Sequence, residues 1–196
     1  MKASSLLVLF CLINVILCYT IGITDKELKA SFKDSLNFIK AFHKKTYSLG
    51  KGVLTGATLT NPILTENNVE FKVGTEYVRV IFQNIRLTLS GGGKVKKSTF
   101  NEFTKFSADL ENFKYEVKFS VASKKLETGK YEVIFSKTSE STPTFKIAKI
   151  TSKFTGLTEI EEQLKNNVKS LDFTPYKAYL NKIASLVIET LPFHMK

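Results

Sequence analysis

The chain has 196 residues and a formal net charge of +11 at pH 7, from 29 Lys and Arg against 18 Asp and Glu. It contains 16 Phe and 7 Tyr but only 2 His and 2 Cys, so few side chains are available for metal, thiol or histidine chemistry. This composition predicts a basic globular protein rich in aromatic residues, and it argues against an enzyme and against a bound metal or cofactor.

The first residues follow the order typical of a secretory signal. Lys2 precedes an apolar run over residues 6–16, which is too short to span a bilayer comfortably, and Gly22 is a small residue suited to cleavage. We therefore expect residues 1–22 to be a signal peptide, residues 23–196 to form a single domain, and the mature protein to be extracellular. The alternative, an uncleaved membrane anchor, fits this pattern less well than a cleaved signal peptide does.

Cleavage after Cys18 or Thr20 would also fit the pattern. Each of these sites removes both cysteines, Cys11 and Cys18, so the mature domain has no disulfide. Removal of Lys2 lowers the net charge from +11 to about +10. A cationic secreted protein is attracted to anionic surfaces such as phospholipid headgroups, bacterial envelopes and glycans, and to nucleic acid without sequence specificity.

The mature chain should begin with an amphipathic helix. Thr24-Asp25-Lys26-Glu27 has the form of a capping box, in which a hydroxyl and a carboxylate satisfy the free N–H groups of the first turn. The apolar residues that follow recur every three or four positions: Leu28, Phe32, Leu36, Ile39 and Phe42. This spacing predicts a helix of about twenty residues that ends near Thr46 to Gly50.

The middle of the chain has the alternation of β-strands. Between Gly52 and Thr155, apolar and polar residues alternate and predict about six or seven antiparallel strands. The clearest strand covers residues 113–121, and further strands are expected at 131–135 and 145–154. The alternation changes parity at Gln83-Asn84, which indicates a β-bulge.

Gly91-Gly92-Gly93 is expected to form a hairpin turn, because glycine clusters between strands are typical of turns. Although Lys94 follows these glycines, the segment is not a phosphate-binding loop, because the first glycine and the spacing of that motif are missing. Phe103 is out of parity with the apolar residues around it, and we expect it to be exposed near such a tip.

The C-terminal part returns to a helical period. One stripe of apolar residues begins near Thr158, and a second, more apolar stripe follows Thr174-Pro175 and ends before Pro192. The two histidines, His43 and His194, have no cysteine or carboxylate spaced for a metal site or a catalytic triad. The order of one helix, several strands and two helices predicts an α+β fold.

Several segments resemble the N-terminal half of the bactericidal/permeability-increasing and lipopolysaccharide-binding protein family, part of the tubular lipid-binding (TULIP) superfamily. They are Ile85–Lys94, Phe106–Leu110, Tyr115–Val121, the strands at 130–138 and 143–154, and the helix pair Ser152–Pro192. The resemblance implies a strongly curved antiparallel sheet, a super-roll, wrapped around an N-terminal helix and long C-terminal helices. It also implies that acyl chains are held in the apolar interior.

The strands and helices of this plan place a set of apolar residues along an elongated interior, although a filled core requires the same periodicity as a cavity. The residues expected to line it are Leu36, Ile39, Val80, Phe82, Leu87, Val117, Phe119, Val133, Phe135, Phe145, Ile147, Ile183 and Val187. The residues expected to contact anionic surfaces are Lys94, Lys96, Lys97, Lys124 and Lys125.

The sequence therefore favours a secreted protein that holds a phospholipid, a fatty acid or a similar hydrophobic molecule, with basic loops that contact anionic membranes or lipopolysaccharide. The main alternative is a cationic host-defence protein that acts at bacterial membranes without a carried ligand. A secreted hydrolase and a helix-grip or cystatin-like domain are weaker alternatives. No specific nucleic-acid partner is expected, and the oligomeric state stays open.

Overall fold

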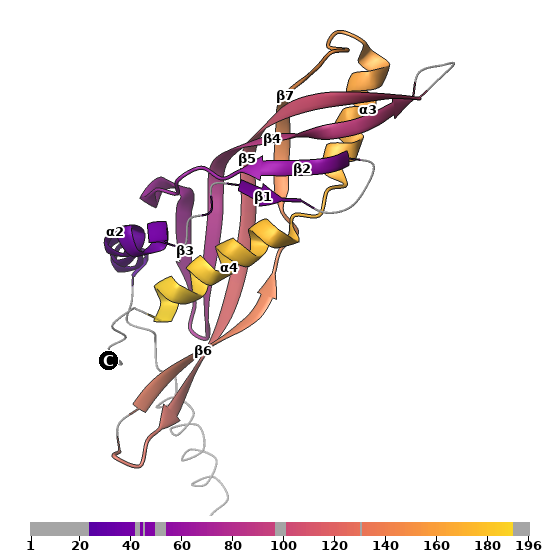
Figure 1. The fold of residues 1–196 in the computed structure, drawn as a ribbon. Helices are drawn as coiled ribbons and strands as arrows, with labels where there is room; N and C mark the ends of the chain where they lie inside the picture. The colour runs from indigo at the N-terminus through magenta and orange to yellow at the C-terminus, as the bar shows by residue number, and fades with distance from the viewer. Residues whose placement is uncertain are drawn as a thin grey trace, which may run out of the picture.

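The computed structural model describes residues 24–41, 44, 46–49, 54–96, 101–129 and 131–189. It combines one large sheet with helices from both ends of the described chain (Figure 1). In chain order the elements are α2 (Asp25–Ala41), β1 (Thr46–Ser48), β2 (Leu54–Thr60), the 3₁₀ turn η1 (Glu66–Asn68), β3 (Val69–Val73), β4 (Tyr77–Lys96), β5 (Asn101–Lys125), β6 (Tyr131–Glu140), β7 (Thr144–Ser152), α3 (Thr158–Lys169) and α4 (Thr174–Glu189).

The sheet is built on one long hairpin. β4 and β5 have 20 and 25 residues and pair along nearly their whole length. One half of β4 pairs with β2 and the other with β3, while one half of β5 pairs with β6 and the other with β7. All seven strands are antiparallel, and the sheet is curved and does not close on itself (Figure 1). The predicted α+β fold with a strongly curved antiparallel sheet is confirmed.

Two asparagines produce the bend in the hairpin. Asn84 on β4 and Asn112 on β5 have positive φ angles of 56° and 54°, and the register between the strands shifts at this point. Asparagine adopts this left-handed conformation more readily than most residues, so both strands can change direction together. The bulge predicted at Gln83-Asn84 is confirmed, whereas its counterpart at Asn112 was not predicted.

The predicted turn at Gly91–Gly93 is wrong, because these glycines lie inside β4 and pair with β5. Glycine suits position 91, where β4 approaches the backbone of β2 closely. A Cβ atom on Gly91 would lie 3.0 Å from the backbone of Ala57 on β2, and one on Gly92 would lie 2.2 Å from the ring of Phe103. Phe103 itself is 52% exposed, as predicted.

The N-terminal helix begins as predicted but ends earlier. The backbone N–H of Thr24 donates to Glu27 at 2.7 Å, and the N–H of Glu27 donates to the hydroxyl of Thr24 at 3.3 Å, so the capping box is present. The predicted end near Thr46 to Gly50 is wrong, because Thr46–Ser48 forms β1. Tyr47 of this strand is buried and pairs with Leu59 of β2, so tertiary packing decides its conformation.

The helices cover the apolar face of the sheet. α4 crosses the inner side of the sheet. α3 packs against β4 and β7, near the end of the sheet where β4 is joined to β5 (Figure 1). α2 packs against β3, where the rings of Phe32 and Phe71 are 6.4 Å apart, and also against α4.

The starts of α3 and α4 agree with the prediction. Pro192, the predicted end of the last helix, and Lys97 lie outside the described residues. None of the described helices is both long and apolar enough to cross a membrane.

Candidate functional site

Twelve of the thirteen residues predicted to line the interior belong to, or pack against, one hydrophobic cluster between the sheet and the helices. The buried ones are Ile39, Val80, Phe82, Leu87, Val117, Phe119, Ile183 and Val187. The partly buried ones are Leu36, Phe135, Phe145 and Ile147. Val133 is also partly buried, but it lies outside the cluster on the β5–β6 hairpin. Contact of these residues with a ligand stays a prediction.

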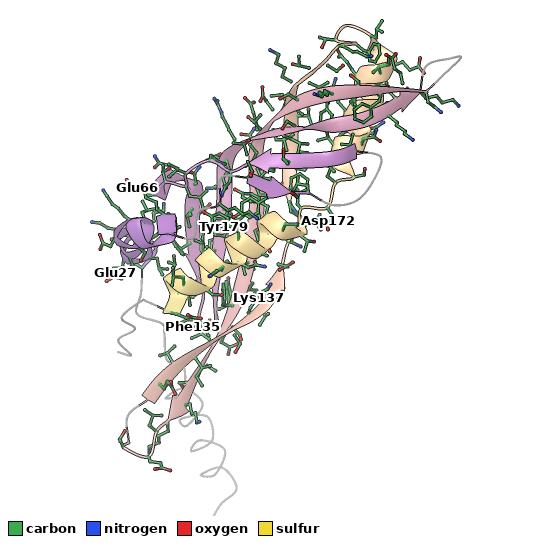
Figure 2. The ribbon with its side chains drawn as sticks, viewed as in Figure 1. Glu27, Glu66, Phe135, Lys137, Asp172 and Tyr179 are labelled. Carbon is green, nitrogen blue, oxygen red and sulfur yellow. The ribbon has the colours of Figure 1, made fainter. Side chains whose placement is uncertain are left out.

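The apolar inner face continues beyond the helix that covers it. The β5–β6 hairpin extends past the C-terminal end of α4 (Figure 1), and residues 122–129 are all exposed. Val121 on β5 pairs directly with Phe135 on β6, and both are only partly buried. Figure 2 shows Phe135 near this end of α4. The hydrophobic cluster therefore reaches solvent at the base of the hairpin.

An aromatic group that the sequence analysis did not identify lies under the start of α4. The rings of Tyr176 and Tyr47 are 5.5 Å apart, those of Tyr47 and Tyr179 also 5.5 Å, and those of Tyr176 and Tyr179 6.0 Å. Phe113 of β5 completes the group at 5.4 Å from Tyr176. We call Tyr47, Tyr176 and Tyr179 the tyrosine cluster. The only local signal for it was two tyrosines three residues apart at the start of a helix.

The hydroxyls of the tyrosine cluster stay protonated at neutral pH. Burial, followed by the proximity of Tyr179, raises the pKa of Tyr47 to about 12. Burial also raises the pKa values of Tyr176 and Tyr179. These phenols are therefore neutral groups that can donate a hydrogen bond inside an otherwise apolar region.

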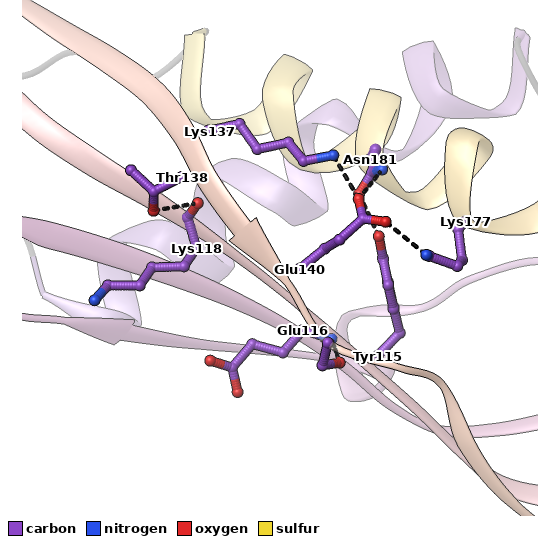
Figure 3. Close-up of polar contacts among 9 residues, drawn as sticks. Tyr115, Glu116, Lys118, Lys137, Thr138, Glu140, Lys177 and Asn181 are labelled. Carbon is purple, nitrogen blue, oxygen red and sulfur yellow. Dashed lines mark hydrogen bonds and ion pairs between the residues drawn. The ribbon is translucent and has the colours of Figure 1, made fainter. Parts of the chain in front are cut away.

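A polar group fastens α4 to the sheet at the point where the hairpin leaves the body (Figure 3). Glu140 of β6 accepts hydrogen bonds from Lys137 and Lys177, each at 2.5 Å, and from the amide of Asn181 at 2.9 Å. The hydroxyl of Tyr115 donates to Asn181 at 2.7 Å. We call these five residues the Glu140 cluster. It joins β5, β6 and α4 beside the exposed end of the apolar face.

The charges of the Glu140 cluster set its protonation states. Hydrogen bonds from Lys137 and Lys177 hold the pKa of Glu140 well below its usual range. Burial, followed by the hydrogen bond and charge of Glu140, raises the pKa of Tyr115. The cluster thus contains an ionised carboxylate between two cations and a neutral phenol.

Replacing Glu140 with glutamine should make the stability of the protein less dependent on pH. Because the folded-state pKa lies below the ordinary value of 4.5, the ion pairs stabilise the fold above that pH and this stabilisation is lost as the pH falls. At pH 7 the variant should lose about 1 kcal/mol, since the carboxylate is partly exposed and screened. Urea unfolding at several pH values between 2 and 7 measures both effects. The exposed Glu132→Gln on the same strand is the control, and equal pH profiles of Glu140→Gln and wild type would contradict the expectation.

The basic residues predicted to contact anionic surfaces form two groups at opposite ends of β5. Lys94 and Lys96 are exposed near the end of β4, where the backbone of Lys96 and the side chain of Gln163 exchange hydrogen bonds of 2.9 and 2.8 Å. Lys124 and Lys125 are exposed at the far end of β5. The structure therefore separates the two predicted contact regions.

A hollow lies between α2 and the segment η1–β3. It has a volume of about 670 Å³ and is lined by charged residues of both signs, including Lys33 and Glu66, which form an ion pair of 3.6 Å. Its polar lining differs from the predicted apolar interior. Across the described ranges, no group of His, Cys, Asp and Glu side chains is arranged to hold a metal ion.

Comparison with solved structures finds a structural likeness, whereas no family model and no curated protein matches the chain. The fold is similar to that in a crystal structure of lipopolysaccharide binding protein, with a TM-score of 0.44 and 16% sequence identity. The similar region covers 86% of this chain and 39% of that chain, so the present chain spans less than half of that protein. These values do not assign the chain to a family.

Proposed function

We propose that this protein is a secreted lipid-binding protein and not an enzyme, and that it holds a hydrophobic ligand such as a phospholipid or fatty acid between the curved sheet and α4. The observation that supports this most is the apolar inner face, which continues from the buried cluster to solvent at Val121 and Phe135. A concave apolar surface with an open end suits a ligand that must enter from water or from a membrane.

Strand geometry supports a continuous path for such a ligand. Side chains two residues apart on a strand point to the same face, so Val117, Phe119 and Val121 share the inner face of β5. The first two are buried and the third is partly exposed. An acyl chain at the base of the hairpin would cover apolar surface that the protein itself leaves open.

The tip of the β5–β6 hairpin has the chemistry of a membrane contact. Leu126 and Ile134 are 39% and 38% exposed. Leu126 directly follows Lys124 and Lys125 in the chain, and Ile134 on β6 pairs with Ala122, two residues before Lys124. Apolar side chains next to cations favour binding to anionic lipid surfaces, including the phosphorylated lipid of lipopolysaccharide. The proposal therefore places membrane contact next to the open end of the apolar face.

Native mass spectrometry and organic extraction of the protein, secreted from a eukaryotic host without detergent, test the carrier function. We expect a co-purifying lipid in near-stoichiometric amount. Protein that arrives empty and stays empty after exposure to a lipid mixture would contradict the proposal. That result would favour the alternative of a cationic host-defence protein without a ligand.

Reversing two charges at the tip, Lys124→Glu together with Lys125→Glu, should weaken binding to vesicles of phosphatidylcholine and phosphatidylglycerol at least about thirtyfold. Each cation near an anionic surface contributes about 1 kcal/mol, so removing two corresponds to about 2 kcal/mol. Vesicle sedimentation at several salt concentrations measures the effect. Lys146→Glu with Lys149→Glu, two exposed lysines of β7, is the matched control. Equal binding of both double variants would show that the tip has no special role.

A further inference from the structure

The hydroxyl of Tyr176 is buried without a partner inside the described part of the protein. Tyr176 is 0% exposed, and no described group forms a hydrogen bond with its oxygen. The other two hydroxyls of the tyrosine cluster differ, because Tyr47 has a backbone hydrogen bond with Lys44 and Tyr179 a side-chain hydrogen bond with Asn61. A buried hydroxyl without a partner destabilises a fold.

Packing alone does not explain a tyrosine at this position. Its ring contacts Phe113 at 5.4 Å, and the neighbouring Phe145 and Phe173 also pack against Phe113 at 6.5 and 5.9 Å. Phenylalanine at 176 would preserve the same ring contacts without burying an unpaired oxygen. The described side chains around the hydroxyl of Tyr176 therefore give it no hydrogen-bond partner.

The position of Tyr176 points to a ligand along α4. Leu180, Ile183 and Val187 follow it at intervals of four, three and four residues, so they share one buried face of the helix with it. Tyr176 is the polar end of this apolar stripe, and Phe135 lies near the opposite end of α4 (Figure 2). A long hydrophobic molecule between the sheet and α4 would have its exposed end near Phe135. It would therefore bring an oxygen to Tyr176 only if that oxygen lay at its other, buried end.

The charge of the surroundings restricts that oxygen. Lys177, the cation next in the chain, is already bound to Glu140 at 2.5 Å, and the exposed ammonium of Lys44 lies over the ring of Tyr47, 5.7 Å from its centroid. A carboxylate or phosphate beside the fully buried hydroxyl of Tyr176 would lose its water without a buried cation from the described residues next to it, which is strongly unfavourable. A neutral ester, ether or ketone oxygen would accept the hydrogen bond without this penalty.

One wall of the tyrosine cluster is a short strand at the edge of the sheet. Tyr47 belongs to β1, which has three residues and pairs with β2 alone among the described strands. Short edge strands open more easily than the long central strands of a sheet. A ligand group could reach Tyr176 through displacement of this strand while the β4–β5 hairpin stays intact.

We propose that the hydroxyl of Tyr176 donates a hydrogen bond to an uncharged oxygen of the hydrophobic ligand, so that the protein prefers neutral oxygen-bearing lipids such as esters, ethers or ketones. This inference rests on the proposed lipid-binding function and specifies the ligand class within it.

Tyr176→Phe, which removes only the hydroxyl, tests the inference with two fluorescent polyenes, methyl cis-parinarate, which has an ester, and diphenylhexatriene, which has no oxygen. We expect the variant to bind the ester about fivefold to tenfold more weakly, the effect of one neutral hydrogen bond, and to bind diphenylhexatriene as the wild type does. Without ligand it should melt at or above the wild-type temperature. Tyr179→Phe is the matched control, since its hydroxyl already has a partner, and it should not separate the two probes.

Three results would overturn the inference, and they have different meanings. Unchanged binding of the ester to Tyr176→Phe, with diphenylhexatriene still bound, would leave the lipid-binding function standing and remove the role of Tyr176. A lower melting temperature of the ligand-free variant would show that the hydroxyl has a partner within the chain. Failure of the wild type to bind either probe would remove the proposed function as well.

Discussion

Phe135→Asp should reduce lipid occupancy at least about tenfold while the body of the protein stays folded. Phe135 pairs with Val121 where the apolar inner face reaches solvent, and it is only partly buried. A carboxylate there would have to be desolvated by any acyl chain that passes over it, at a cost of more than 1 kcal/mol. Native mass spectrometry measures occupancy, and thermal unfolding shows whether the fold is preserved.

The neighbouring residue provides the control for this variant. Ser136 is exposed and lies on the opposite face of β6, so Ser136→Asp introduces the same charge without placing it on the apolar path. We expect full occupancy in Ser136→Asp. Equal losses in both variants would indicate a general charge effect, and full loading of Phe135→Asp would place the entrance elsewhere.

Phe113→Ala should lower the free energy of unfolding by about 3–5 kcal/mol, which is a large fraction of the stability of a typical domain. Phe113 is 0% exposed and packs against Phe145, Phe173 and Tyr176 beside the bend in the β4–β5 hairpin. Removal of its ring would leave a cavity that the rigid strands around it cannot fill. Urea unfolding at neutral pH measures the loss.

An exposed phenylalanine on the same strand gives the comparison. Phe103 is 52% exposed and covers Gly92, so Phe103→Ala should change the stability by less than about 1 kcal/mol. If both variants lost the same stability, the aromatic group around Phe113 would not be the centre of the core.

Local patterns predicted much of the fold, because caps, breaks and bulges are determined by nearby residues. The capping box at Thr24, the start of α4 at Thr174 and the bulge at Asn84 all occur where the sequence places them. The glycines at 91–93 were misinterpreted because glycine suits both a turn and a close approach between strands. Only the position of Ala57 on β2, more than thirty residues away in sequence, decides between the two.

The candidate site was predicted less completely for a similar reason. Alternation identified the side chains that face inward, and this holds for Val117, Phe119 and Val121. Alternation does not show where a covering helix ends, and so Val133 was expected inside the cluster. The Glu140 cluster joins Tyr115 to Asn181, 66 residues apart, and no local pattern could have revealed it.

The packing of α2 against α4 has a consequence for how the protein is made. These are the first and last described elements of the chain, yet they touch across the apolar face. During synthesis, which proceeds from the N-terminus, every strand of the sheet leaves the ribosome before α4 does. The part of the inner face that α4 covers therefore stays uncovered until the last helix arrives, and during this stage of synthesis it is open to chaperones and membranes.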